Sequence, residues 1–223
     1  MTKYSAWARE ALAILSKDLR SELRTKYALN AILMFAVVTL SAVSFAVGQF
    51  AIGNDVRAAF LWIVLFFSAM SGLGRVFVKE EDAGTVNVLR LSARASVVYV
   101  GKLVFNTLLL FALAVIVVPL FVVLMGLEVQ DVALFTAVLV IGTAGLAGAS
   151  TIIAAIIAKA SAKGELFAVL AFPILLPLLV TAIGGTRRAL DGAGAAGEAQ
   201  MLLSYLVVMV TVSLFLFDFV WDD

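Results

Sequence analysis

The sequence contains no cysteine and no histidine, and only 14% of its 223 residues are charged. Without cysteine the chain forms no disulfide and no thiolate metal site, and without histidine it has no imidazole ligand for a metal or a haem. It also lacks the Gly-x-x-x-x-Gly-Lys-Ser/Thr pattern of a phosphate-binding loop, so we expect no ATP binding of that kind. We predict no catalytic residue, no cofactor site and no metal site in this chain.

Charged residues are missing from long intervals, which predicts membrane spans. The charge-free intervals are 27–54, 58–74, 103–127, 132–158, 166–186 and 199–217. A helix of about 20 apolar residues crosses a hydrocarbon core, and Arg75 extends the second interval because its side chain can reach the interface. We therefore predict an all-α polytopic membrane protein with one transmembrane domain over residues 1–223, its six spans at about 28–51, 58–78, 103–126, 132–158, 166–184 and 200–220.

The basic residues are distributed unequally about these spans. Of the 16, 13 precede the first span or follow the second and fourth, and only Arg57, Arg187 and Arg188 lie on the other side. The positive-inside rule therefore predicts that both termini are cytoplasmic. No signal peptide is expected, because nine charged residues precede the first apolar run. The charge-free intervals hold no Asp, Glu, Lys, Arg or His for a proton or ion relay, so energy is expected to come from another protein.

Residues 3–26 are predicted to form an amphipathic helix in the cytoplasmic membrane interface. Apolar residues, including Trp7, recur at three- and four-residue spacing. Basic residues lie away from this stripe, namely Arg9, Lys17, Arg20 and Arg24. The alternative is a basic anchor that only fixes the topology.

Small residues and prolines mark two of the spans. The fourth contains Gly142, Gly145 and Gly148, whose spacing predicts a helix packing surface, with the lining of a pathway as the alternative. The fifth contains Pro173 and Pro177, which predict a kinked or discontinuous helix, either with a mechanistic role or merely bent. Residues 184–200 are predicted to be the longest outer loop, and the Trp-Asp pair at 221–222 an interface anchor.

The charged segment 79–102 between the second and third spans is predicted to contact a second protein. Its residues expected at that contact are Glu80, Glu81, Asp82, Gly84, Thr85, Val86, Leu89 and Arg90. Gly84 breaks the chain after the acidic cluster, and Thr85 is expected to cap a short helix from Val86 to Leu91. On that helix Val86, Leu89 and Arg90 share one face, and Val88 and Leu91 point the opposite way. Ser96 is expected to cap the third span. The alternative is a solvated loop that only fixes topology.

This segment resembles the cytoplasmic signature of ABC-2-type permeases. The resemblance rests on EDAGTVNVL at 81–89, on Ser92, and on Gly101-Lys102 before an apolar helix, although Ala93 and Val88 replace the usual proline and leucine. The length, the amphipathic start, the glycine-rich fourth span and the Pro-x-x-x-Pro of the fifth span resemble the CcmB family, the haem exporter protein B of cytochrome c maturation.

The resemblance implies a non-catalytic permease subunit with a type V exporter-like fold in a bacterial or archaeal cytoplasmic (inner) membrane. ATP and Mg would bind a separate CcmA-like ATPase, in which the N-terminal helix and residues 80–91 would be seated. Hydrolysis would drive haem delivery or release of the haem-loaded chaperone. The implied partners are a CcmC-like haem-handling protein, a small CcmD-like subunit, a CcmE-like chaperone, membrane lipid and a second permease copy, with no nucleic acid.

For haem in such a complex this chain offers only methionine and tyrosine as axial ligands, so stable ligation by the chain is not expected. Two alternatives remain open at this point. One is a generic ABC-2 exporter permease for a lipid, a glycan or a drug. The other is a membrane protein with a structural or assembly role and no transport activity.

Overall fold

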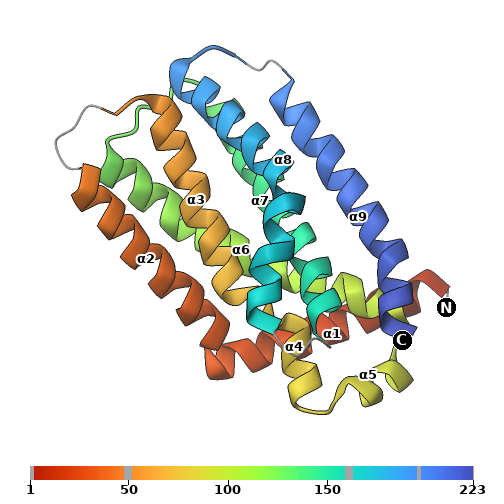
Figure 1. Ribbon diagram of the computed structural model, residues 1–223. Coiled ribbons are helices and arrows are strands. Elements are labelled where there is room, and N and C mark those ends of the chain that lie inside the picture. Colours follow the sequence, from red (N-terminus) through yellow and green to blue (C-terminus); the bar gives the residue numbers. More distant parts are fainter. Residues whose placement is uncertain (1–2, 48–51, 159–162, 195–196, 223) are drawn as a thin grey trace.

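The structure, a computed structural model, describes residues 3–47, 52–158, 163–194 and 197–222, and within them it contains nine helices and no strand. Six helices run side by side as a bundle (Figure 1): α2 (Tyr27–Val47), α3 (Asn54–Gly72), α6 (Ala95–Met125), α7 (Val132–Ile157), α8 (Lys163–Asp191) and α9 (Glu198–Asp222). Three helices lie at the end of the bundle where both chain termini lie: α1 (Lys3–Thr25), α4 (Arg75–Asp82) and α5 (Val86–Ser92). We call this the terminal end.

Six helical segments of the described chain are long and apolar enough to cross a membrane, the second being α3 continued by α4. The predicted all-α membrane protein is therefore confirmed. Helix α8 continues beyond the predicted fifth span to Asp191, so it includes Arg187 and Arg188 and the first part of the predicted outer loop 184–200 is helical. Arg188 is accommodated at the helix end because its Nε pairs with Glu198 at 3.3 Å and donates to the Gly194 carbonyl at 3.0 Å. Residues 48–51 of the first predicted span lie outside the described chain.

Helix α7 is the central element of the bundle. It contacts α3, α4, α6, α8 and α9, and residues 145–155 are all buried. A Cβ atom at Gly142 would lie within 3.0 Å of the Trp62 ring, and one at Gly145 would lie within 3.0 Å of Leu178. These glycines thus let α3 and α8 approach α7 closely. At Gly148 the nearest atom would be 4.0 Å away, so there a side chain has room.

Helix α8 runs without interruption through Pro173 and Pro177, so the predicted possibility of a discontinuous helix is wrong. Prolines leave carbonyl groups without an amide donor, and such groups need partners in lipid. The carbonyls that lose their helical amide donor are those of Val169 and Pro173, four residues before each proline. Hydroxyl groups donate to two other carbonyls of this stretch, Thr181 to Pro177 and Tyr205 of α9 to Ile174, both at 2.9 Å. Figure 1 shows α8 changing direction midway along its length.

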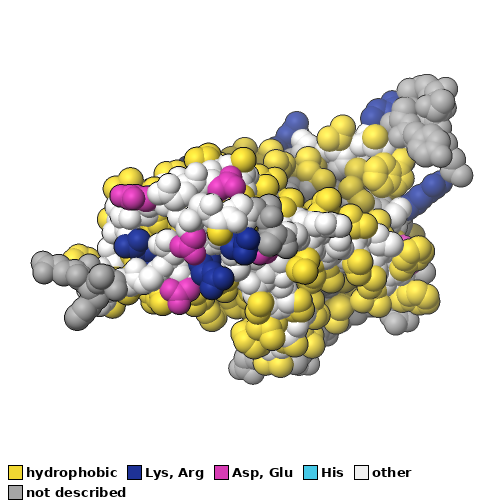
Figure 2. All heavy atoms as spheres, turned by 90° about the horizontal axis from the view of Figure 1, so that it is seen from above, with side chains coloured by type: hydrophobic (Ala, Val, Ile, Leu, Met, Phe, Trp, Pro, Cys, Tyr) yellow, Lys and Arg dark blue, Asp and Glu magenta, His cyan; other side chains and the backbone are white. Residues whose placement is uncertain are grey.

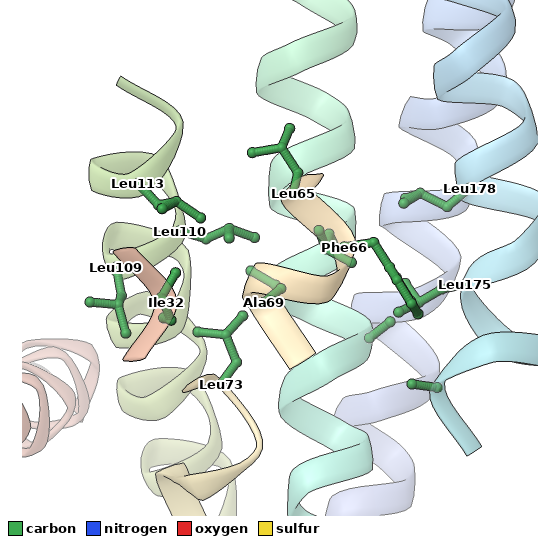
Figure 3. Packing of buried hydrophobic residues seen from close by; sticks show 14 of the residues in the cluster. Ile32, Leu65, Phe66, Ala69, Leu73, Leu109, Leu110, Leu113, Leu175 and Leu178 are labelled. Carbon is green, nitrogen blue, oxygen red and sulfur yellow. The ribbon is translucent and has the colours of Figure 1, made fainter. Parts of the chain in front are cut away.

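Apolar side chains fill the space between the helices. Figure 3 shows Leu65 and Ala69 of α3 between Leu110 and Leu113 of α6 on one side and Leu175 of α8 on the other. All five side chains are fully buried. Because lipid tails are as apolar as leucine, this packing stabilises the bundle through van der Waals contact.

The end opposite the terminal end carries acidic and basic side chains close together in one small patch (Figure 2). Asn54 at the start of α3 donates to the Asp191 carboxylate at the end of α8, at 2.8 Å. The Asp131 carboxylate caps α7 by accepting from the Leu134 amide at 2.9 Å. The Asn54 bond joins the ends of α3 and α8, and the Asp131 amide joins α7 to α8 by donating to the Ala189 carbonyl at 2.9 Å.

Candidate functional site

The turn between α4 and α5 is built by Gly84. Its φ of +66° lies in the left-handed region, where glycine carries no steric cost. The Gly84 amide donates to the Glu81 carbonyl at 3.0 Å and the Thr85 amide to the Glu80 carbonyl at 3.0 Å, which is the Schellman pattern of a helix C-terminus. The predicted break after the acidic cluster is thus confirmed. Helix α5 begins at the residue after Thr85.

Thr85 occupies the N-cap position of α5 but does not cap it with its side chain. Its φ and ψ of −92° and −4° are helical rather than extended, whereas a capping side chain needs an extended N-cap residue. The hydroxyl instead donates back to the Glu80 carboxylate at 2.7 Å. The predicted cap at Ser96 is also wrong, because Arg94 is the N-cap of α6 and the Ser96 hydroxyl accepts from Trp7 Nε1 at 3.5 Å.

Helix α5 has two different faces, as its sequence predicts. Val86 and Leu89 pack against the apolar core of the bundle, and the Arg90 guanidinium lies 5.5 Å from the centre of the Trp221 ring. Val88 and Leu91 point away from the bundle and are 65% and 91% exposed. The short helix is therefore held along one side and presents two apolar side chains on the other.

A buried lysine links three helices beside α5. The Lys102 side chain of α6 is fully buried, and its ammonium donates to the Val76 carbonyl at 2.9 Å. It also lies 3.3 Å from a carboxylate oxygen of Asp18 on α1 and 3.3 Å from one of Glu80 on α4. Lys17 pairs with both carboxylates from the solvent side, contacting Glu80 and lying 3.3 Å from Asp18. We call Lys17, Asp18, Glu80 and Lys102 the ionic cluster.

The ionic cluster balances two cations against two carboxylates, which is the condition under which charges are tolerated away from water. Burial lowers the pKa of Lys17, but the hydrogen bond to Glu80 and the negative charges of Asp18 and Glu80 outweigh burial and raise that pKa above 10.5. Lys17 therefore stays charged at neutral pH. Because Glu80 bonds to Lys102, Lys17 and Thr85 at once, α1, α4, α6 and the start of α5 are joined through one carboxylate.

An aromatic cluster adjoins the ionic cluster. Phe77 of α4 and Tyr99 of α6 pack on Phe217 of α9, with ring centres 5.3 and 5.1 Å apart, and Phe217 stacks on Trp221 at 5.3 Å. Lys102 Nζ lies 5.2 Å from the centre of the Phe77 ring, which joins this cluster to the ionic one. Trp221 is only 8% exposed, so its predicted role as an interface anchor is wrong.

Helix α1 has three faces rather than two. Ala11 and Ile14 are buried against α6, where a Cβ at Gly101 would lie 3.1 Å from the Ala11 carbonyl oxygen and 2.8 Å from Ile14. Leu12, Leu19 and Leu23 form an exposed apolar stripe. The predicted basic residues Arg9, Lys17, Arg20 and Arg24 are all exposed. The single apolar stripe predicted for this helix is thus two apolar faces, one packed against the protein and one pointing outward.

The structure brings together only part of the predicted contact residues. Glu80 is turned inward into the ionic cluster, with a side chain 13% exposed. Val86, Leu89 and Arg90 also face the bundle, and Glu81 lines a small cavity beside them. Their contact with a second protein stays a prediction. Gly142, Gly145, Gly148, Pro173 and Pro177 lie in α7 and α8, apart from the terminal-end clusters.

Two members of the ionic cluster, Asp18 and Lys102, were not among the predicted site residues. Each had a signal in the sequence. Trp7, Ala11, Ile14 and Asp18 follow one another at spacings of four, three and four, which places a carboxylate on the packed stripe of α1. Lys102 is a single charge inside a long apolar helix, where charged residues need a partner.

Comparison with known proteins identifies the family of this chain. The family model described as CcmB protein matches residues 9–220. A heme exporter protein B of Rhodobacter capsulatus is 26% identical to this chain over 204 residues, which cover 91% of this chain and 93% of that protein. A heme exporter protein B of Pseudomonas aeruginosa is 22% identical over 204 residues, covering 91% and 92%. Because the family model covers nearly the whole sequence, the chain belongs to the CcmB protein family.

Proposed function

We propose that this chain is the membrane-spanning subunit of an ATP-binding-cassette transporter for haem, and that α5 is the contact for a separate ATPase subunit. One observation carries the proposal: α5 exposes Val88 and Leu91 while its other side is packed on the bundle. Burying an exposed valine or leucine fully stabilises a complex by about 1.5–3 kcal/mol each. A short helix with an apolar face suits docking into a groove of a partner.

A displacement of α5 is transmitted to the bundle through a defined series of contacts. The inward face of α5 packs beside Trp221 of α9, and Thr85 holds Glu80 at the end of α4. Glu80 in turn pairs with Lys102 of α6 and Lys17 of α1. Displacing α5 therefore displaces α4 and acts on α9, α6 and α1 together. In this proposal, ATP and Mg bind the partner, and dimer closure of two ATPase subunits moves α5 in each of two permease copies.

The proposal places the terminal end in the cytoplasm of a bacterial or archaeal cell, with both termini on that side of the inner membrane. The support is the distribution of basic residues, of which 13 of 16 precede the first span or follow the second and fourth. An ATPase that uses cytoplasmic ATP must dock on that side. The exposed Leu12, Leu19 and Leu23 stripe of α1 then lies toward the lipid of the inner leaflet.

Haem enters the proposal as cargo, because the relatives carry the name heme exporter protein B. We propose that ATP hydrolysis drives haem delivery or release of a haem-loaded chaperone, in a complex with CcmA-like, CcmC-like, CcmD-like and CcmE-like proteins. The chain has no histidine or cysteine for axial ligation. Its part in the proposal is therefore mechanical coupling, and haem ligation belongs to the partners.

Co-purification with the ATPase tests the proposal. Replacing Val88 and Leu91 together by serine is expected to lower recovery of the ATPase without lowering the melting temperature, because both side chains are exposed. Leu91→Met, which keeps the apolar area, is the matched control and is expected to retain the ATPase. The Glu81→Lys/Asp82→Lys variant extends the test to the acidic residues. Undiminished recovery of the ATPase and normal ATP-driven activity in the Val88 and Leu91 variant would contradict the proposed contact.

A further inference from the structure

A cavity of about 260 Å³ opens at the terminal end, in the corner between α1, α2, the α3–α4 junction and α6. Its outer part is lined by exposed Arg75 and Lys79 and by the carboxylates of Asp18 and Glu22, and its inner part by buried Phe105 and Asn106. Charges of both signs thus surround the opening, and an apolar wall with one amide lies inside. Asp18 of the ionic cluster also lines this cavity, whereas no residue of the aromatic cluster does.

Asn106 has an unused hydrogen-bond acceptor. Its Nδ2 donates to Thr151 Oγ1 at 2.9 Å, and the Thr151 hydroxyl itself donates to the Ala147 carbonyl at 2.7 Å. The Thr151 hydroxyl therefore accepts its hydrogen bond from Asn106, so the nitrogen of the Asn106 amide faces Thr151 and the amide oxygen, Oδ1, is the atom that remains. Oδ1 has no partner among the described residues, although Asn106 is only 1% exposed. A buried acceptor without a partner needs an explanation, and a donor from a molecule or a water in the adjoining cavity supplies one.

The opening supplies an anion site. Arg75 is held in place by donating to the Tyr27 hydroxyl at 2.7 Å with its guanidinium 4.5 Å from the Tyr27 ring centre. A guanidinium has five N–H groups, so this bond leaves others to bind a phosphate. Lys79 lies on the next turn and donates to Ser21. Glu22, 9% exposed, accepts from the Leu29 amide at 2.9 Å and adds a negative charge beside them.

Size and charge together select a ligand class. Pockets for drug-sized molecules measure about 300–1,000 Å³, so a cavity of about 260 Å³ suits a group smaller than a tetrapyrrole. A ligand with one anion, one cationic donor and no net charge matches a lining that holds the basic Arg75 and Lys79, the acidic Asp18 and Glu22, and the amide of Asn106. Tyr27 at the opening begins the first span and is 56% exposed, so the opening lies where lipid headgroups lie.

We propose that this cavity binds the phosphoethanolamine headgroup of a membrane phospholipid. The phosphate lies against Arg75 and Lys79, and the ammonium donates to Asn106 Oδ1 near Glu22. Phosphatidylcholine is rejected because its quaternary ammonium has no N–H to donate. Phosphatidylglycerol has hydroxyl donors, but its net negative charge is disfavoured by Glu22. The bound lipid fills the corner where the interface helix α1 turns into the first span.

Lipid retention by the purified full chain tests this proposal. Native mass spectrometry and thermal unfolding are measured after exchange into micelles with phosphatidylethanolamine, phosphatidylcholine or phosphatidylglycerol, and with water-soluble phosphoethanolamine in lipid-free detergent. We expect phosphatidylethanolamine to be retained best and to raise the melting temperature most. Arg75→Gln is expected to lower its retention roughly tenfold, the value of one charge-assisted hydrogen bond. Asn106→Leu is expected to abolish the preference over phosphatidylcholine.

Arg94→Gln is the matched control, since Arg94 is exposed and does not line this cavity. Equal retention of phosphatidylethanolamine and phosphatidylcholine would overturn the proposal, as would equal losses in the Arg75 and Arg94 variants. Stabilisation by soluble phosphoethanolamine without any effect of the lipid would overturn the assignment to a membrane lipid. Because Arg75 is exposed, its variant keeps the test valid if Asn106→Leu fails to fold. ATPase binding is not the readout, so this test is separate from that of the proposed function.

Discussion

Replacing Lys102 by methionine is expected to destabilise the protein far more than the same change at Lys17. Both lysines pair with Glu80 and Asp18, but the Lys102 side chain is fully buried whereas that of Lys17 is 45% exposed. Methionine keeps an apolar stem of similar length and removes the ammonium. The two variants therefore remove one charge from the same pair of carboxylates and differ in access to water.

The expected loss of stability follows from the groups that lose their partner when the Lys102 ammonium is removed. The Val76 carbonyl loses a donor at 2.9 Å, and Asp18 and Glu80 are left with Lys17 alone. Removing one partner of a buried ion pair costs about 3–5 kcal/mol, whereas exposed pairs contribute about 0–1 kcal/mol. The carboxylates are 11% and 13% exposed and keep one cation. We therefore expect a loss of about 2–3 kcal/mol for Lys102→Met, and about 0.5 kcal/mol for Lys17→Met.

Thermal unfolding in detergent, followed by tryptophan fluorescence, measures this difference. In a protein of this size 1 kcal/mol corresponds to about 2–4 °C, so Lys102→Met should lower the melting temperature by roughly 5–10 °C and Lys17→Met by about 2 °C or less. Adding Glu80→Gln to Lys102→Met should restore part of the loss, because the carboxylate left without Lys102 is then neutral. Equal shifts for the two single lysine variants would refute the reasoning that burial makes Lys102 the stronger link.

Three further predictions use the same measurement. Gly142→Ala should lower the melting temperature, because overpacking against Trp62 costs about 1–3 kcal/mol, while Gly148→Ala, which has room, should leave it unchanged. Gly84→Ala should cost about 1 kcal/mol through its left-handed φ of +66° alone, since no atom lies within 4 Å of the new Cβ. Because the pKa of Lys17 is raised in the folded protein, its charge stabilises the fold fully below pH 10.5, and this stabilisation is lost as the pH rises through the folded-state pKa. The melting temperature should therefore fall above pH 10.5, and it should fall less in Lys17→Met.

The spans and the two faces of α5 could be predicted from the sequence because each depends on a local pattern. A charge-free interval of sufficient length defines a span, and a helical period separates Val86 and Leu89 from Val88 and Leu91. The period alone does not say which face meets the bundle. That is decided by Trp221, which lies far along the chain and packs beside the Val86 face.

For a similar reason, the inward position of Glu80 could not be predicted from the local sequence. Three consecutive acidic residues are equivalent in composition, and only the arrival of Lys102 and Lys17 from other helices singles out the first. The pairing of Asp18 with Lys102 could have been predicted by asking which charged residues lie on packed or apolar stripes. Each is a charge placed on an otherwise packed or apolar stripe, the two have opposite signs, and both are predicted to lie on the cytoplasmic side of the membrane.

The ionic cluster has a role that apolar packing could not fill. Replacing a buried ion pair by apolar residues is often neutral for stability, so stability alone does not account for it. Helix α1 carries two apolar faces, one through Ala11 and one through Leu12, which lie about 100° apart at 3.6 residues per turn. Apolar burial alone would let either face pack on α6. Asp18 shares the Ala11 face, and its pairing with Lys102 is lost if α1 rolls to present Leu12. The cluster thus fixes the rotation of α1, and through Glu80 it ties that rotation to the position of α5.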